Sequence, residues 1–108
     1  MPPDERVDHY LASLRRWAGR LRRIAGVWDS PDFDPRERQA FPIEWGNVIE
    51  RLAKVEALGA HGTLRPAARE ELRQVAEELT DLLPTMRRLG VCLPDLEALE
   101  RARSVEAA

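Results

Sequence analysis

The side chains able to do acid–base, metal or nucleophilic chemistry are scattered along this sequence of 108 residues. His9 and His61 lie far apart, and no Glu-x-x-His pair, the signature of a metal site in a helical bundle, occurs. The neighbouring acids Glu70–Glu71 and Glu77–Glu78 would point about 100° apart on a helix, so they cannot share a proton or a metal ion. The sequence therefore predicts a protein that is not an enzyme and holds no cofactor.

Cys92 is the only cysteine, so no internal disulfide can form. Its neighbours Val91 and Leu93 are apolar, and we expect a buried, inert thiol because a reactive cysteine needs exposure and cationic neighbours. The absence of a disulfide framework favours a reducing compartment, and the charged first residues do not resemble a signal peptide. No apolar run approaches the ~20 residues that span a bilayer. We expect cytoplasmic localisation and no membrane partner.

A concentration of arginine near the N-terminus is the remaining chemical signal. Residues 9–28 contain five arginines and no acid, although the net charge of the whole chain is −2. These five are Arg15, Arg16, Arg20, Arg22 and Arg23. Sixteen arginines against one lysine are also what a GC-rich, bacterial-like genome would encode, so composition alone assigns the arginines no role.

On a long helix the five arginines occupy defined sides. Arg15 with Arg22, and Arg16 with Arg23, form two rows that face away from the apolar stripe. We expect the other helices not to reach these four side chains. Arg20 lies on the flank of the stripe, where we expect it to meet acids of the third predicted helix.

Small residues separate the two arginine rows, namely Ala12, Gly19 and Gly26. Each glycine inside a helix costs about 1 kcal/mol relative to alanine. Close approach of another backbone, or of a phosphate chain, would compensate for that cost. The arginine rows and the small residues together predict a docking surface, and a merely solvated face is the alternative.

Apolar residues recur at alternating spacings of three and four, which predicts helices and no strands. The expected helices cover 5–28, 43–58, 66–89 and 94–103. Pro84 lies inside the third segment, but the apolar phase continues through it, so we expect one helix kinked at Pro84. Asp34-Pro35 predicts one or two helical turns within the connection 29–41. Gly59 and Gly90 are expected to end the second and third helices.

These elements predict an all-α fold, a small helical bundle of three principal helices and a short C-terminal helix. We expect a single domain over 1–108, with flexible ends at 1–4 and 104–108. The expected core contains Leu14, Trp17, Leu21, Ile24, Trp45, Val48, Leu52, Val55, Leu72, Val75, Leu79 and Leu82.

Four aromatic residues lie around the longest connection, namely Trp28, Phe33, Phe41 and Trp45. Aromatic side chains dominate both small cores and the energetic centres of protein interfaces. The sequence leaves both interpretations open: core anchors, or an aromatic interface patch.

Three classes of binding function are compatible with this pattern. We expect first a non-enzymatic interaction or assembly subunit that docks on another protein or on itself. The alternative is a small nucleic-acid-binding subunit whose arginine face neutralises RNA or DNA phosphates. A small-molecule pocket has no polar constellation to support it, and the apolar side of the first helix is committed to the core rather than to a membrane surface.

Overall fold

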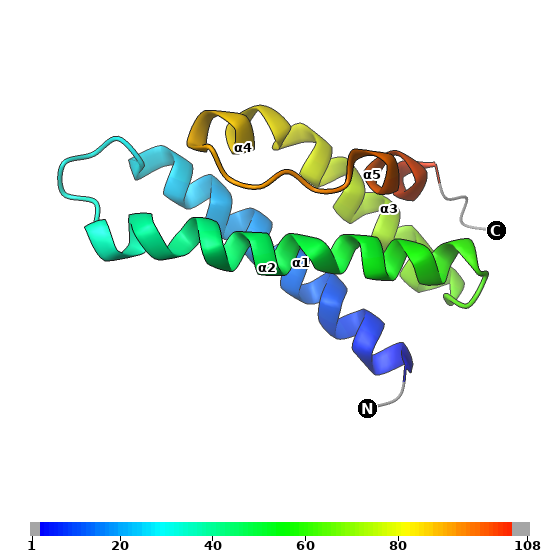
Figure 1. Cartoon of the computed structure of the whole chain (residues 1–108). Coiled ribbons are helices and arrows are strands. Elements are labelled where there is room, and N and C mark those ends of the chain that lie inside the picture. The colour runs from blue at the N-terminus through cyan, green and yellow to red at the C-terminus, as the bar shows by residue number, and fades with distance from the viewer. Residues whose placement is uncertain (1–2, 105–108) are drawn as a thin grey trace.

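The computed structural model describes residues 3–104, and these residues form five helices (Figure 1). They are α1 (Pro3–Val27), α2 (Pro35–Ala60), α3 (Pro66–Asp81), α4 (Leu83–Leu89) and α5 (Leu96–Arg103). No strand occurs between residues 3 and 104, and the all-α prediction is confirmed. Of the ends expected to be flexible, residues 3 and 4 belong to α1, whereas 1–2 and 105–108 lie outside the described residues.

Four of the helices surround a common core. α1 packs against α2 and α3, and α5 packs against the same two helices. The chain reverses direction between α1 and α2 and again between α2 and α3, so α1 and α3 run the same way (Figure 1). The short helix α4 contacts α1 and α3.

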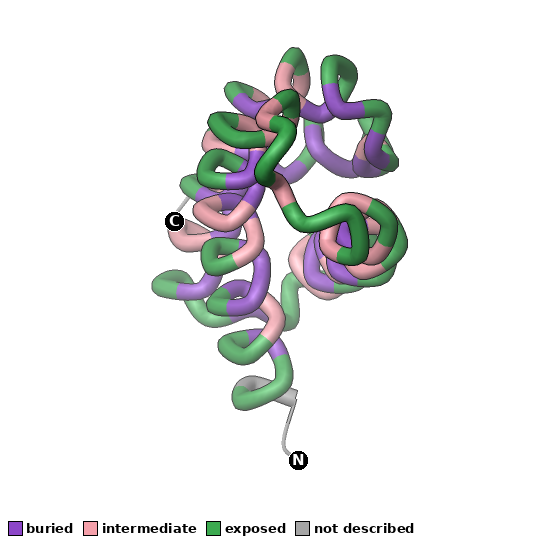
Figure 2. The backbone as a smooth tube through the Cα atoms, turned by 90° about the vertical axis from the view of Figure 1, so that its left-hand side faces the viewer, coloured by how far each residue is buried: buried purple, intermediate pink, exposed green. Residues whose placement is uncertain are grey.

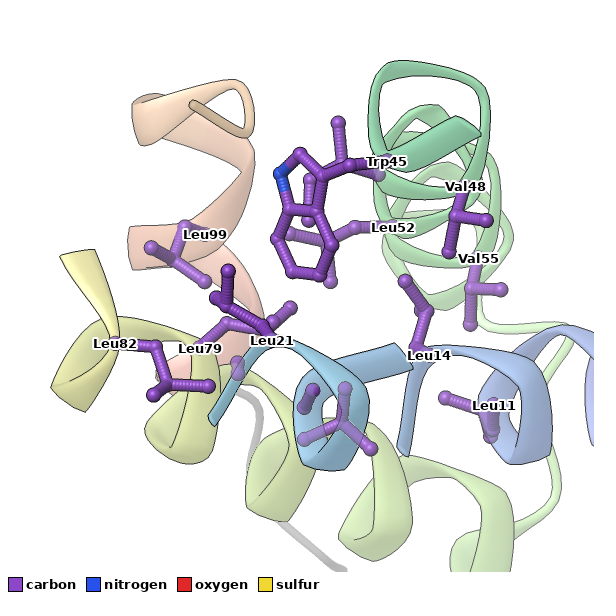
Figure 3. Packing of buried hydrophobic residues seen from close by; sticks show 14 of the residues in the cluster. Leu11, Leu14, Leu21, Trp45, Val48, Leu52, Val55, Leu79, Leu82 and Leu99 are labelled. Carbon is purple, nitrogen blue, oxygen red and sulfur yellow. The ribbon is translucent and has the colours of Figure 1, made fainter. Parts of the chain in front are cut away.

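The buried apolar side chains form one cluster between these helices. Buried and exposed residues alternate along each helix, as the apolar periodicity requires (Figure 2). Eleven of the twelve expected core residues are buried, and the exception is Trp17, which is only partly buried. Figure 3 shows the Trp45 ring reaching from α2 toward Leu21 of α1 and Leu99 of α5.

α2 begins at Pro35 rather than at the expected Ile43. The Asp34 carboxylate accepts a hydrogen bond from the backbone N–H of Arg36 at 2.9 Å, so the helix-start signal is confirmed. The prediction that this helix would end after one or two turns is wrong. The helix continues, and the connection after α1 is correspondingly short.

Pro42 lies inside α2, where a proline normally interrupts a helix. It cannot donate the usual hydrogen bond to the carbonyl of Arg38. Phe41 and Trp45 nevertheless stay four residues apart on one side of the helix, where they are 0% and 1% exposed. Burying two large aromatic side chains outweighs the cost of the proline, which is about 3 kcal/mol.

The segment 66–89 consists of two helices, α3 and α4, so the expectation of one helix kinked at Pro84 is not confirmed. Leu82 separates the two helices, and its N–H closes α3 by donating to the carbonyl of Leu79 at 3.1 Å. Pro84 falls in the first turn of α4, where its missing N–H is not needed. The continuous apolar phase correctly predicted burial of Leu82 and Met86 on both sides of the junction.

One helix end and one connection require a left-handed backbone. Gly90 has φ of 71° and ends α4, as expected. Gly59 is helical, so the expectation that it stops the second helix is wrong. The left-handed residue of that connection is Gly62, also with φ of 71°, just after α2 has ended at Ala60.

α5 is held against α2 by a buried acid. Its expected start at Pro94 shifts to Leu96, because the Asp95 carboxylate caps the helix. Arg101 donates to both carboxylate oxygens of Glu56 at 2.7 and 3.3 Å, and Glu56 is only 6% exposed. This hydrogen bonding raises the pKa of the Arg101 guanidinium. The ion pair offsets the free energy that burial of the charged Glu56 carboxylate would otherwise cost.

Cys92 is exposed, which corrects the expectation of a buried thiol. The connection from α4 to α5 is not helical, and along it Val91 and Pro94 point inward whereas Cys92 points outward. Apolar neighbours in sequence therefore do not share its side of the chain. The backbone carbonyl of Cys92 accepts a hydrogen bond from the Trp45 indole N–H at 2.8 Å.

We predict that Leu79→Ala lowers the free energy of unfolding by about 2–5 kcal/mol, because it leaves a cavity in the cluster. Leu79 is 0% exposed. The matched control is Ile43→Ala, at a position that is 68% exposed, where we expect a change of at most about 0.5 kcal/mol. Urea titration measures both. Equal effects of the two variants would contradict the assigned core.

We predict that Pro42→Ala raises the free energy of unfolding by about 1–3 kcal/mol, since it restores a donor to the interior of α2. Pro35→Ala is the control, because the first helical position needs no such donor and its change should be small. Thermal or urea unfolding compares them. A loss of stability in Pro42→Ala would mean that the proline is required for the shape of α2.

Candidate functional site

The two arginine rows expected on one open face of α1 have different surroundings. Arg15 pairs with Glu71 at 3.3 Å, and Arg22 pairs with Glu78 at 2.6 Å. Both acids belong to α3, so the expectation that packed helices cannot reach this row is wrong. The cause is that α3 packs against α1 beside this row.

These two ion pairs belong to a longer series between the α1 side and the α3 side of the molecule. Asp8 pairs with Arg65 at 2.9 Å, and Asp29 pairs with Arg88 at 3.4 Å. The α1-side members of the series are Asp8, Arg15, Arg22 and Asp29, each seven residues after the last. We call these four contacts the α1–α3 ion-pair row.

Arg20 pairs with acids of α2. The expectation that it would meet acids of the third predicted helix is wrong. Its guanidinium lies 3.2 Å from Glu37 and 3.6 Å from Glu44. It also stacks over the Trp17 ring, with 4.6 Å between the guanidinium carbon and the ring centroid. The continuity of α2 explains the difference, because Glu37 and Glu44 lie on one helix that packs against α1.

Arg16 and Arg23 are the arginines of the predicted surface that stay without an ion pair among the described residues. Both are exposed, and seven residues of helix separate them by about 10 Å. Together with Trp17 and Arg20 they line a hollow of about 240 Å³. Two uncompensated cations therefore border a half-buried indole.

A second and larger hollow, of about 480 Å³, adjoins the first at Arg20 and Arg23, which line both. Its apolar lining comes from Ile24, Val27 and Phe33. Its polar lining comes from Ser30, Asp32, Asp34 and Glu37. We call the two hollows together the α1 trough. It extends from Arg16 at one end to acids of the α1–α2 connection at the other, and Arg23 lines both of its parts.

The small residues beside the trough lie open. Gly26 is exposed, Gly19 is partly exposed, and a Cβ added to either would meet no heavy atom within 4 Å. Ala12 is exposed as well. No helix of residues 3–104 packs onto this stripe, so the structure supplies no contact that explains the two glycines.

The four aromatic residues proposed as a patch do not lie together on the surface. Phe41 and Trp45 are buried in the core, with 6.1 Å between their ring centroids, so they cannot contact a partner. Trp28 and Phe33 are partly buried and lie 5.8 Å apart at the end of the trough. The Arg38 guanidinium lies 5.4 Å from the Trp28 ring centroid and 5.2 Å from that of Phe33.

The site residues that sequence analysis missed lie at the end of α1, in the connection to α2 and in the first turn of α2. Val27, Asp32 and Glu37 carry no pattern of their own in the sequence. Glu37 and Glu44 are seven residues apart and would have indicated a shared helical side, had the helix been predicted to pass through Pro42. Spacing could have found this pair.

Other chemistry gains no support from the described residues. His9 and His61 are both exposed. Within residues 3–104 no group of three His, Cys, Asp or Glu side chains is placed to hold a metal ion. In the same part of the chain, none of the helices combines the length and apolar character that crossing a bilayer requires.

Neither a protein-family model, nor a curated protein, nor a solved structure matches this chain. The geometry of the α1 trough and its surroundings therefore carries the functional argument.

We predict that Gly19→Ala raises the free energy of unfolding by about 0.5–1 kcal/mol, because alanine has the higher helix propensity and the new methyl group meets open space. Gly59→Ala is the matched control within a helix. There the Cβ would approach Leu64 Cδ1 at 3.2 Å, so the gain should be smaller or absent. Urea titration compares the two. A loss of stability in Gly19→Ala would mean that a contact of the isolated chain requires this glycine.

Proposed function

We propose that this chain is a non-enzymatic helical interaction subunit that docks on a partner protein through the outward side of α1. The observation that carries the proposal is that some arginines of α1 form ion pairs within the described residues and others do not. Arg15, Arg20 and Arg22 are neutralised by α2 and α3, whereas Arg16 and Arg23 border the α1 trough without an ion pair in the described part of the chain. A partner with complementary charge would supply the missing contacts.

Charge favours a different protein over a second copy of this one. In a two-fold symmetric dimer the same surface patch faces itself. A dimer centred on this side of α1 would bring Arg16 and Arg23 of one copy toward the same arginines of the other. Like charges facing each other across an interface are unfavourable, so the surface fits an acidic partner better than itself.

Nucleic acid is the second candidate, favoured by the closeness of Arg16, Arg23 and the Trp17 ring. Guanidinium groups and aromatic faces are the groups that contact single-stranded nucleic acid. The acids on both sides weaken this candidate. Glu37 and Glu44 lie along one flank of the arginines and α3 carries acids along the other. A phosphate backbone that crossed the face would be repelled at both flanks.

Affinity purification with the full chain, with and without nuclease, tests the proposal. We predict that the captured partner resists nuclease and that Arg16→Gln with Arg23→Gln weakens its binding at least about tenfold, which corresponds to about 1.4 kcal/mol. The matched control removes two other exposed cations that lack an ion pair among the described residues, Lys54→Gln with Arg87→Gln.

Three results decide between the candidates. Loss of binding in the Arg16/Arg23 variant alone supports the protein interface. Capture that disappears with nuclease supports nucleic acid in its place, and a steep fall of affinity with salt should accompany it. If the Arg16/Arg23 variant binds with wild-type affinity, the proposal that the basic side of α1 takes part in docking is wrong.

A further inference from the structure

The α1 trough combines the apolar side chains of Ile24, Val27 and Phe33 with two arginines that have no ion pair among the described residues, and this combination restricts what can occupy it. We infer that it binds a short amphipathic segment of a partner protein, acidic at one end and with a large apolar side chain at the other. The inference rests on the proposed function and deepens it by naming the chemistry of the partner. The acidic end would lie over Arg16 and Arg23, and the apolar side chain would enter the hollow beside Val27.

The larger hollow has the size and lining that an apolar side chain requires. Its volume of about 480 Å³ leaves room for a large side chain in a hollow that is open to solvent. Val27 is 46% exposed, and it is one of the few large apolar side chains that the fold leaves in water. Ile24 and Phe33 extend this apolar lining. Covering Val27 would remove apolar surface from water, which gives the contact a favourable free energy.

Charge sets the direction in which such a segment would lie. In the part of the trough that precedes Val27 along α1, Arg16 and Arg23 attract carboxylates, because neither is neutralised by a described residue. At the end formed by the α1–α2 connection, Asp32 and Asp34 repel them. Glu37 and Glu44 already compensate Arg20 in the middle. A segment with its acids together at one end fits this order, whereas a uniformly acidic segment does not.

The length of the trough limits the length of the segment. Arg16 and Val27 are eleven residues apart on α1, which is about 16 Å along the helix axis. A partner helix of about three turns, or about five residues of extended chain, spans this distance. Recognition of a short helix along a groove by a few spaced anchors is a common mode of peptide binding.

Selection from a random twelve-residue peptide display library on the immobilised full chain tests the inference. We expect the enriched peptides to carry at least two acids at one end and a large apolar residue toward the other. Fluorescence anisotropy of a synthesised, labelled peptide from this set then measures affinity. Reversal of the order of its residues should weaken binding.

Two pairs of variants separate the contributions of charge and apolar contact. Arg16→Gln with Arg23→Gln should weaken binding of the peptide at least about tenfold, whereas Lys54→Gln with Arg87→Gln should not. Val27→Asn should also weaken it several-fold, whereas Ile43→Asn, which changes another exposed apolar residue outside the trough, should leave it unchanged. Circular dichroism and urea titration check that each variant folds.

The inference is overturned if no peptide is enriched, if the enriched peptides lack acids, or if Val27→Asn binds them as the wild type does. Its failure is distinct from failure of the proposed function. A cellular protein that depends on Arg16 and Arg23 but not on Val27 would support the interface and remove the apolar anchor. If the peptides bind as expected but no cellular protein depends on Arg16 and Arg23, the peptide site is supported and the proposed function is contradicted.

Discussion

Trp45 lies where α1, α2 and the connection between α4 and α5 meet, and its side chain is 1% exposed. Its ring packs against Phe41, and its indole N–H donates a hydrogen bond to the backbone carbonyl of Cys92. The hydrogen bond satisfies the polar atom that a buried indole would otherwise leave without a partner. The Trp45 side chain thus fixes the connection between α4 and α5 to α2. The neighbouring Phe41 ring packs against Trp17 of α1, with 5.8 Å between the two ring centroids.

The same aromatic contacts position the candidate site. Trp17 is partly buried because it packs against Phe41, and the Arg20 guanidinium lies over both rings. Arg20 is held in turn by two acids of α2, so its guanidinium forms a wall of the α1 trough instead of a mobile charge. The surface that we propose for docking is therefore connected to the core through the contacts of Trp17 with Phe41 and with Arg20, and through the ion pairs of Arg20 with α2. Fixing those side chains in advance lowers the entropy cost of binding.

Sequence patterns predicted what depends on neighbours along the chain. The heptad spacing placed eleven of twelve core residues correctly, and the Asp34-Pro35 signal located a helix start. Contacts between distant segments were not predictable in this way. Whether Pro42 breaks α2 depends on how much free energy the burial of Phe41 supplies, and a local pattern does not contain that quantity.

The arginines illustrate the same limit at the site. All five lie on the sides of α1 that the helical pattern assigns to them. Which of them stay free was decided by the neighbours, because α3 supplies acids to Arg15 and Arg22, and α2 supplies them to Arg20. Arg16 and Arg23 differ from the others in position on the helix by a fraction of a turn, yet no described acid reaches them.

The α1–α3 ion-pair row has a consequence for the register of the two parallel helices. From Asp8 of α1 to Asp29 just after it the signs run minus, plus, plus, minus, and on the side of α3 and α4 they run plus, minus, minus, plus. Apolar stripes that repeat every seven residues would tolerate a slip of one heptad. Such a slip would set Asp8 against Glu71 and Arg22 against Arg88. Exposed pairs of this kind add little to stability, but their order of signs penalises the slipped alignment and so selects the native one.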